Sequence, residues 1–154
     1  RNDLTALAIR IETLMITSRG QRMRPPRKIA FALAYYLWTL SEDLPEPDWA
    51  HPGADIFQAN CAGCHQNDEL VGGLVPLEVI GTPGAVGASP NRGTGHYRVP
   101  SLRGVSDRSP LFASGSVPDL TSLLDPERSV PGHRFGLQLS EEDRANLLGF
   151  LHKL

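Results

Sequence analysis

Two cysteines and a histidine are the residues of this sequence whose types and spacing most clearly indicate chemistry. Cys61 and Cys64 are the only cysteines among the 154 residues, and His65 follows the second one directly. Thiols at this spacing can add to the two vinyl groups of a porphyrin, while the adjacent imidazole coordinates the iron from the same side. The pattern Cys-x-x-Cys-His is the attachment motif for c-type haem. We therefore predict one covalently bound haem c, held by Cys61, Cys64 and His65.

Other uses of a cysteine pair explain less of this pattern. A structural disulfide would not require His65 in the next position. A zinc site would need two more ligands, and the sequence has no second cysteine pair. A thioredoxin-like redox pair usually lies in a strand–helix unit, whereas residues 54–60 before this pair have a helical pattern. Haem attachment accounts for both cysteines and the histidine together.

The elements that must position this motif are helices separated by long loops. Apolar residues at helical spacing predict helices over residues 1–20 and 26–40, and the composition of residues 41–47 indicates a linker. Most of the 15 glycines and 13 prolines lie between Gly53 and Gly136. We expect a bound group, rather than regular secondary structure, to organise that section.

Two helices flank the loop-rich section. A short helix over residues 54–60 leads to the cysteine pair, and a closing helix is predicted over residues 140–152. Ser140 would cap the closing helix, with Asp143 as its partner three residues later. The predicted buried face of this helix consists of Ala145, Leu147, Leu148, Leu151 and Leu154.

The region from residue 53 onward resembles class I cytochromes c. Residues 53–65 look like the opening helix and haem motif of that family. Residues 76–82, 97–105 and 132–140 are similar to segments of the C-terminal haem domain of bacterial dihaem cytochrome c peroxidases, MauG-like proteins and related single-haem cytochromes. The resemblance implies an all-α class I cytochrome c fold with long Gly/Pro-rich loops and an N-terminal helical extension.

We predict two parts of the chain. Residues 1–48 form the helical extension, and residues 49–154 form a monohaem cytochrome c domain. Residues 32–40 of the extension read much like residues 146–154, and both segments look like the last helix of a cytochrome c domain. The extension is therefore either the remnant of an upstream cytochrome domain that has lost its haem or an unrelated pair of amphipathic helices.

The second axial ligand of the iron decides what the resemblance implies for function. Most electron-transfer cytochromes c use a methionine, but Met15 and Met23 both precede the haem motif. In this fold the ligand normally comes from the loop before the closing helix, which favours His133. Its flanking glycines suit a loop that must approach a flat macrocycle closely. His96 is the second choice, and Met15, Met23 or an open site remain alternatives.

Three further residues are candidates for contacts with the haem or with His65. The resemblance to class I cytochromes c places Pro76 where a backbone carbonyl fixes the tautomer of the axial histidine. Arg98 and Arg103 frame the Val-Pro-Ser-Leu segment and are candidates for binding the negatively charged propionates, with Arg92 behind them. Solvent-exposed arginines are the alternative for each.

The predicted function is one-electron transfer with His65 and His133 on the iron. Two axial histidines would give a low-spin iron and a lower reduction potential than a His/Met pair. A haem peroxidase or MauG-like oxidant is less consistent, because the sequence has one haem motif. Ala113 and Ser114 also replace a His-Asp pair common at that place in those enzymes. A haem sensor whose sixth ligand exchanges is the third hypothesis.

Composition and chemistry limit the partners. The net charge of −2 provides no basic surface for nucleic acid, and the longest apolar stretch, residues 29–40, is too short to span a bilayer. We expect a redox protein as electron donor or acceptor. The apolar helices of the extension could cover the haem domain or form a homodimer.

Covalent haem attachment takes place outside the cytoplasm, so we expect a periplasmic or exported protein. The first residues do not have the pattern of a signal peptide. We interpret the chain as a mature form or a trimmed piece of one, whose signal segment has been removed.

Overall fold

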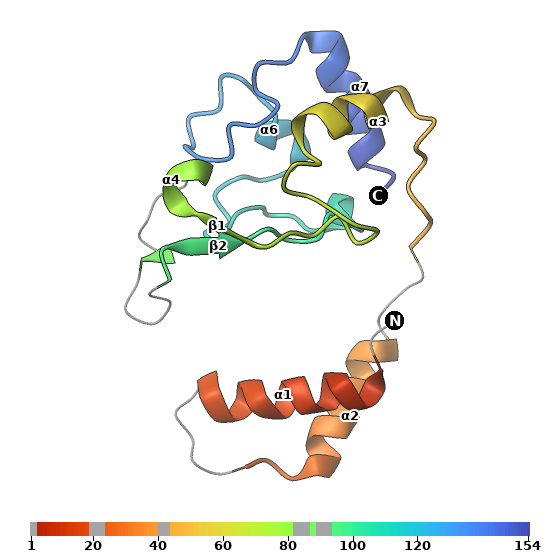
Figure 1. Cartoon of the computed structure of the whole chain (residues 1–154), viewed down its shortest axis with the longest axis vertical. Coiled ribbons are helices and arrows are strands. Elements are labelled where there is room, and N and C mark those ends of the chain that lie inside the picture. The colour runs from red at the N-terminus through yellow and green to blue at the C-terminus, as the bar shows by residue number, and fades with distance from the viewer. Residues whose placement is uncertain (1–2, 19–23, 40–43, 82–86, 89–93) are drawn as a thin grey trace. The chain divides into compact units, whose positions relative to one another are not determined.

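The structure is a computed structural model that describes residues 3–18, 24–39, 44–81, 87–88 and 94–154. The predictions that concern Met23 and Arg92 fall outside these ranges. The chain divides into two units, Arg1–Asp43 and Leu44–Leu154 (Figure 1).

The second unit begins slightly earlier than the predicted boundary after residue 48. Leu44 belongs to it because its carbonyl accepts a hydrogen bond from Arg103 Nη2 at 3.0 Å. The Leu44 side chain also lies against Gly104. Residues 44–48 are therefore part of the haem-motif unit rather than of the extension.

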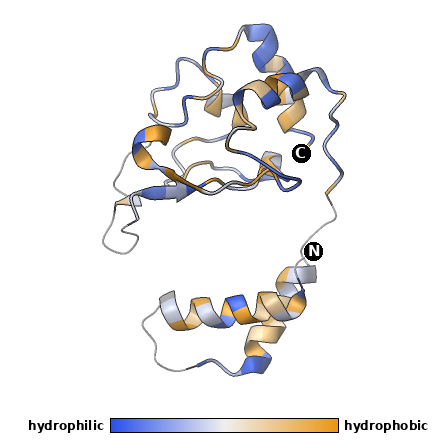
Figure 2. Cartoon of the chain, in the orientation of Figure 1, coloured by the Kyte–Doolittle hydropathy of each residue, from blue (hydrophilic) through white to orange (hydrophobic). Residues whose placement is uncertain are grey.

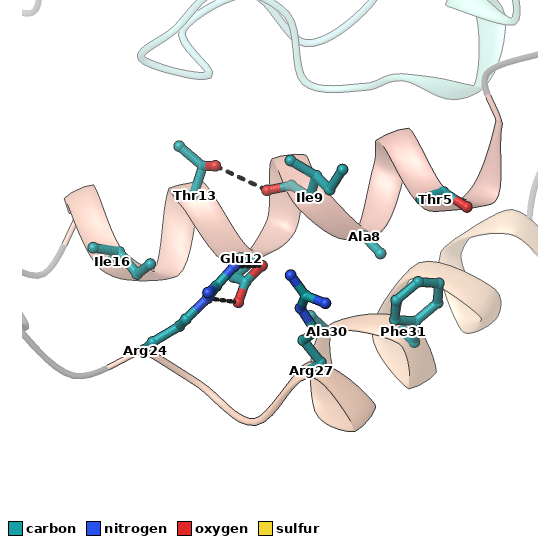
Figure 3. A pocket seen from close by; sticks show the side chains of 10 residues that line it. All are labelled: Thr5, Ala8, Ile9, Glu12, Thr13, Ile16, Arg24, Arg27, Ala30 and Phe31. Carbon is teal, nitrogen blue, oxygen red and sulfur yellow. Dashed lines mark hydrogen bonds and ion pairs between the residues drawn. The ribbon is translucent and has the colours of Figure 1, made fainter.

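The first unit consists of two helices packed against each other, α1 (Leu4–Ser18) and α2 (Arg27–Thr39). Glu12 of α1 is buried and forms an ion pair with Arg24, which lies just before α2 (Figure 3). Apolar residues run along both helices (Figure 2). Several large ones on α2 are exposed. The two helices thus bury only part of their apolar surface against each other.

The core of the second unit lies where α3 (Pro52–Asn60) packs against α7 (Glu141–Leu151) (Figure 1). Phe57 and Phe150 are fully buried, with ring centroids 5.4 Å apart. Trp49 packs on the same Phe150 ring at 5.5 Å. These aromatic contacts fix the two helices relative to each other at the point where α3 leads into the cysteine pair.

Long loops with short elements connect the two helices, as the glycine and proline content predicts. The described elements in this section are β1 (Leu74–Pro76), α4 (Leu77–Ile80), β2 (His96–Arg98), a 3-10 turn (Val105–Asp107) and α6 (Leu120–Leu123). The strands pair antiparallel, with Leu74 opposite Arg98 and Pro76 opposite His96. The predicted all-α class is confirmed, with this small sheet as its only addition among the described residues.

The closing helix confirms one local prediction and corrects another. The hydroxyl of Ser140 accepts a hydrogen bond from the Asp143 amide at 3.1 Å, so Ser140 caps α7 as predicted. Ala145, however, is exposed, and the prediction that it joins the buried face is wrong. Phe150 is buried in its place because it lies one helical turn after Leu147, whereas Ala145 lies on the opposite side of the helix.

We predict that Gly53→Ala destabilises the protein. A Cβ on Gly53 would lie 2.1 Å from the carbonyl oxygen of Asn146, so the contact between α3 and α7 would have to open. Overpacking of this kind costs about 1–3 kcal/mol. This exceeds the roughly 0.5–1 kcal/mol that alanine gains over glycine in a helix. Denaturant unfolding of the haem-loaded protein measures the difference.

Gly73→Ala is the matched control, because a Cβ at Gly73 meets no atom within 4 Å. We expect its unfolding free energy to stay within about 0.5 kcal/mol of the wild type. Equal stability of the two variants would contradict the close α3–α7 contact.

Candidate metal centre

The two cysteines and His65 lie in a tight turn at the end of α3. The amide of Cys61 donates to the Phe57 carbonyl at 2.8 Å, and the amide of His65 donates to the Cys61 carbonyl at 3.0 Å. Both cysteines are free and partly buried. Burial, with a smaller effect of Cys64, raises the pKa of the Cys61 thiol to about 11. Cys61 is therefore a neutral thiol at pH 7.

His65 is buried and its tautomer is fixed. Its Nδ1 donates to the Leu70 carbonyl at 3.0 Å. Burial lowers the pKa of His65, although hydrogen bonds to the carbonyls of Leu70 and Pro100 partly oppose the shift. A neutral ring with its proton on Nδ1 leaves the Nε2 lone pair available for a metal.

The carbonyl that fixes His65 was expected from Pro76, and this prediction is wrong. The bridge between Gln66 and Val71 closes a short turn, and Leu70 adopts a positive φ of 50° within it. This turn brings the Leu70 carbonyl back to the imidazole. Pro76 lies further on in β1, opposite His96.

His133 comes from the loop before α7, and its ring is largely buried. Its Nδ1 is buried and has no hydrogen-bond partner. Burial, followed by the charge of His65, lowers the pKa of His133 to about 4. The ring is therefore neutral at pH 7, and the charge of His65 contributes to that shift.

The other candidate ligands lie in different surroundings. The Nδ1 of His96 donates to the Thr94 carbonyl at 2.5 Å, within its own turn at the start of β2. Met15 belongs to α1 of the first unit. His51 caps α3 by accepting a hydrogen bond from the Gly53 amide at 3.1 Å. Among these histidines, the described effect of the His65 charge falls on His133.

The two predicted propionate contacts differ in their surroundings. Arg103 is only 8% exposed, and its Nη1 is buried without a partner while Nη2 donates to Leu44. A buried N–H group without an acceptor is costly, so Arg103 fits a carboxylate of a bound group. Arg98 is exposed in β2, and its role stays a prediction.

Apolar side chains surround this region. Leu70, Leu120 and Leu124 belong to the buried core cluster, and Cys61 and Leu102 pack against it. Within the described ranges, no three His, Cys, Asp or Glu residues gather as a metal site. A haem iron takes four ligands from its porphyrin, so two axial side chains are enough. Two thiols, neutral imidazoles and an unpartnered guanidinium N–H in an apolar interior fit this group.

Two contacts could not be read from the sequence. The Leu70 acceptor is a backbone carbonyl, so the residue type at position 70 does not reveal it. Arg128 donates to the carbonyls of Val130, Gly132 and His133, and no motif marks an arginine that binds backbone. The only available signal is its position shortly before His133.

A family comparison assigns the second unit. The family model for cytochrome c matches residues 50–154. The chain belongs to the cytochrome c family. Its cofactor is therefore covalently bound haem c, and this cytochrome c is a haem-iron protein. Among the described residues, no helix has the length and apolar character needed to span a membrane.

A solved structure supports the fold. It is described as a MauG-like protein associated with microbial copper homeostasis, and it is similar with a TM-score of 0.52 at 17% sequence identity. The match covers 90% of this cytochrome c and 60% of that chain, so the present chain spans less than two thirds of its neighbour. No curated protein sequence matches. The class I cytochrome c fold, similar to MauG-like haem domains, is thus confirmed.

We predict that replacing both cysteines with alanine abolishes covalent attachment. The Cys61→Ala/Cys64→Ala variant has no thiol to join a vinyl group, so its haem should separate from the polypeptide on a denaturing gel. Haem staining of the gel measures this. Gly63→Ala is the control, because a Cβ there meets nothing within 4 Å. Haem that stays with the double variant would contradict the assignment of the two thiols.

Proposed function

We propose that this cytochrome c is a monohaem one-electron carrier with His65 and His133 as the axial ligands. The supporting observation is that burial lowers the pKa of both imidazoles, and that the charge of His65 further lowers the pKa of His133. Cys61 and Cys64 would hold the porphyrin covalently, and Arg103 would bind a propionate.

The bound haem supplies an iron that takes up one electron in the ferric state and releases it from the ferrous state. The residues of the chain set the conditions for that exchange. The Leu70 carbonyl holds the Nδ1 proton of His65 and increases the basicity of the ligating nitrogen. A second imidazole in place of a methionine sulfur favours the ferric state.

The surroundings of the two histidines favour a small structural change on electron transfer. His65 is anchored in the turn after α3, and the His133 amide donates to the Ile80 carbonyl at 2.7 Å. Both rings therefore belong to hydrogen-bonded segments. The low-spin state that two imidazoles impose is the same in both oxidation states, so neither ligand needs to move.

The compartment and partner are also part of the proposal. Cytochrome c domains are typically exported, and haem attachment outside the cytoplasm supports a periplasmic location. A redox protein would donate or accept the electron. A second copy of the chain could pair through the N-terminal helices, whose apolar side chains are exposed in this chain.

A ligand-exchanging haem sensor is the second candidate, and one observation favours it. His133 adopts a positive φ of 44°, a conformation that costs a non-glycine residue about 1–3 kcal/mol. A change in the loop that let His133 leave this conformation, and with it the iron, would relieve this cost. A mixture of low-spin and high-spin ferric protein at rest would support this candidate over the simple electron carrier.

We predict that His133→Ala converts the ferric iron from low spin to high spin. The alanine leaves the sixth position to water, which is a weak-field ligand. Low-temperature electron paramagnetic resonance of the purified ferric protein measures the change, and the pyridine haemochrome of the same sample counts one haem per chain.

His96→Ala is the control and should keep the low-spin signal, because His96 is hydrogen-bonded within its own turn. A low-spin His133→Ala protein together with a high-spin His96→Ala protein would reverse the ligand assignment. Two haems per chain would contradict the monohaem proposal.

A further inference from the structure

One guanidinium group makes several hydrogen bonds to the loop that carries His133. Arg128 Nη1 donates to the Val130 carbonyl at 2.8 Å. Its Nη2 donates to the carbonyls of Gly132 and His133, at 2.6 and 3.1 Å. One side chain thus binds three carbonyls of the segment that ends at the proposed ligand.

The backbone of this loop needs to be held. Gly132 and His133 have φ values of 102° and 44°, both in the region that favours glycine. A non-glycine residue stays there only when its surroundings fix it. The His133 amide donates to Ile80, so α4 and Arg128 fix the two sides of the same peptide segment. Without Arg128, the hydrogen bond to Ile80 would be the one described hydrogen bond left on the backbone of His133.

Arg128 is itself kept in place. Its guanidinium lies over the Phe112 ring, 5.3 Å from the ring centroid, which is a cation–π distance. Its Nε is buried and has no partner, so the side chain reaches inward rather than toward solvent. The planar fork of an arginine suits several fixed acceptors at once, which the single ammonium of a lysine does not.

We propose that Arg128 is a positioning residue that holds the His133 loop in its ligating conformation and so determines how firmly the sixth iron position is closed to external ligands. This inference rests on the proposed ligation by His133. Arg128 acts through the loop backbone and does not itself touch the iron.

Cyanide binding to the ferric protein tests the proposal, because cyanide must displace the sixth ligand. Arg128→Met removes the fork while keeping an unbranched side chain of similar length. We expect its cyanide affinity to rise roughly tenfold or more, since charged hydrogen bonds to the loop are lost. Arg128→Lys should show a smaller rise. Absorption titrations measure both affinities.

Arg144→Met is the matched control. Arg144 is also partly buried, donates from Nη2 to a loop carbonyl, that of Leu139 at 3.0 Å, and has a buried Nε without a partner. It makes no described hydrogen bond to residues 130–133, which Arg128 binds. We expect its cyanide affinity to stay within about twofold of the wild type.

The outcomes separate this inference from the proposed function. If His133→Ala keeps its low-spin signal, His133 is not the axial ligand, and the inference about Arg128 is overturned as well. If His133→Ala becomes high-spin while both Arg128 variants bind cyanide like the wild type, the inference alone is overturned. If Arg128→Met does not fold, the cyanide affinity of Arg128→Lys tests the inference instead, because lysine keeps the positive charge over Phe112. A wild-type cyanide affinity in that variant, with its haem attached, overturns the positioning role.

Discussion

The proposed haem site of this cytochrome c depends on keeping the largely buried imidazoles of His65 and His133 neutral. Burial would strongly destabilise a charged imidazole, and a charged imidazole has no lone pair for a metal. Burial lowers the pKa of both His65 and His133, and in His133 the charge of His65 adds to the effect. Burial therefore leaves both side chains neutral at pH 7, which the proposed iron ligation requires.

The fold meets this requirement with few regular elements. Aromatic packing between Phe57 of α3 and Phe150 of α7 fixes the end of α3, and the turn after it presents Cys61, Cys64 and His65. Hydrogen bonds to backbone carbonyls then position the two histidines. Leu70 orients His65, Ile80 accepts from the His133 amide, and Arg128 joins the carbonyls around His133. Such a site needs accurately placed loops more than it needs sheets or long helices.

Local signals in the sequence predicted the parts of the site that depend on residue type. The Cys-x-x-Cys-His spacing, the Ser140 cap and the helix before Cys61 are properties of a few adjacent residues. The prediction of Pro76 was wrong because the carbonyl that reaches His65 depends on the path of the turn from Gln66 to Val71. Every residue type carries the same backbone carbonyl, so the sequence does not show which carbonyl accepts a hydrogen bond. For the same reason the role of Arg128, which binds backbone carbonyls, could not be predicted. Ala145 was misplaced because the helical face was assigned from hydrophobicity, whereas the angular position of Phe150 decides it.

Near-infrared magnetic circular dichroism of the wild-type ferric protein tests the central claim most directly. The ligand-to-metal charge-transfer band at these wavelengths reports the pair of axial ligands, and it needs no variant that could disturb the fold. The account predicts the band of a low-spin iron with two neutral imidazoles, from His65 and His133. A band typical of histidine–methionine ligation, or a high-spin spectrum with water in the sixth position, would contradict it.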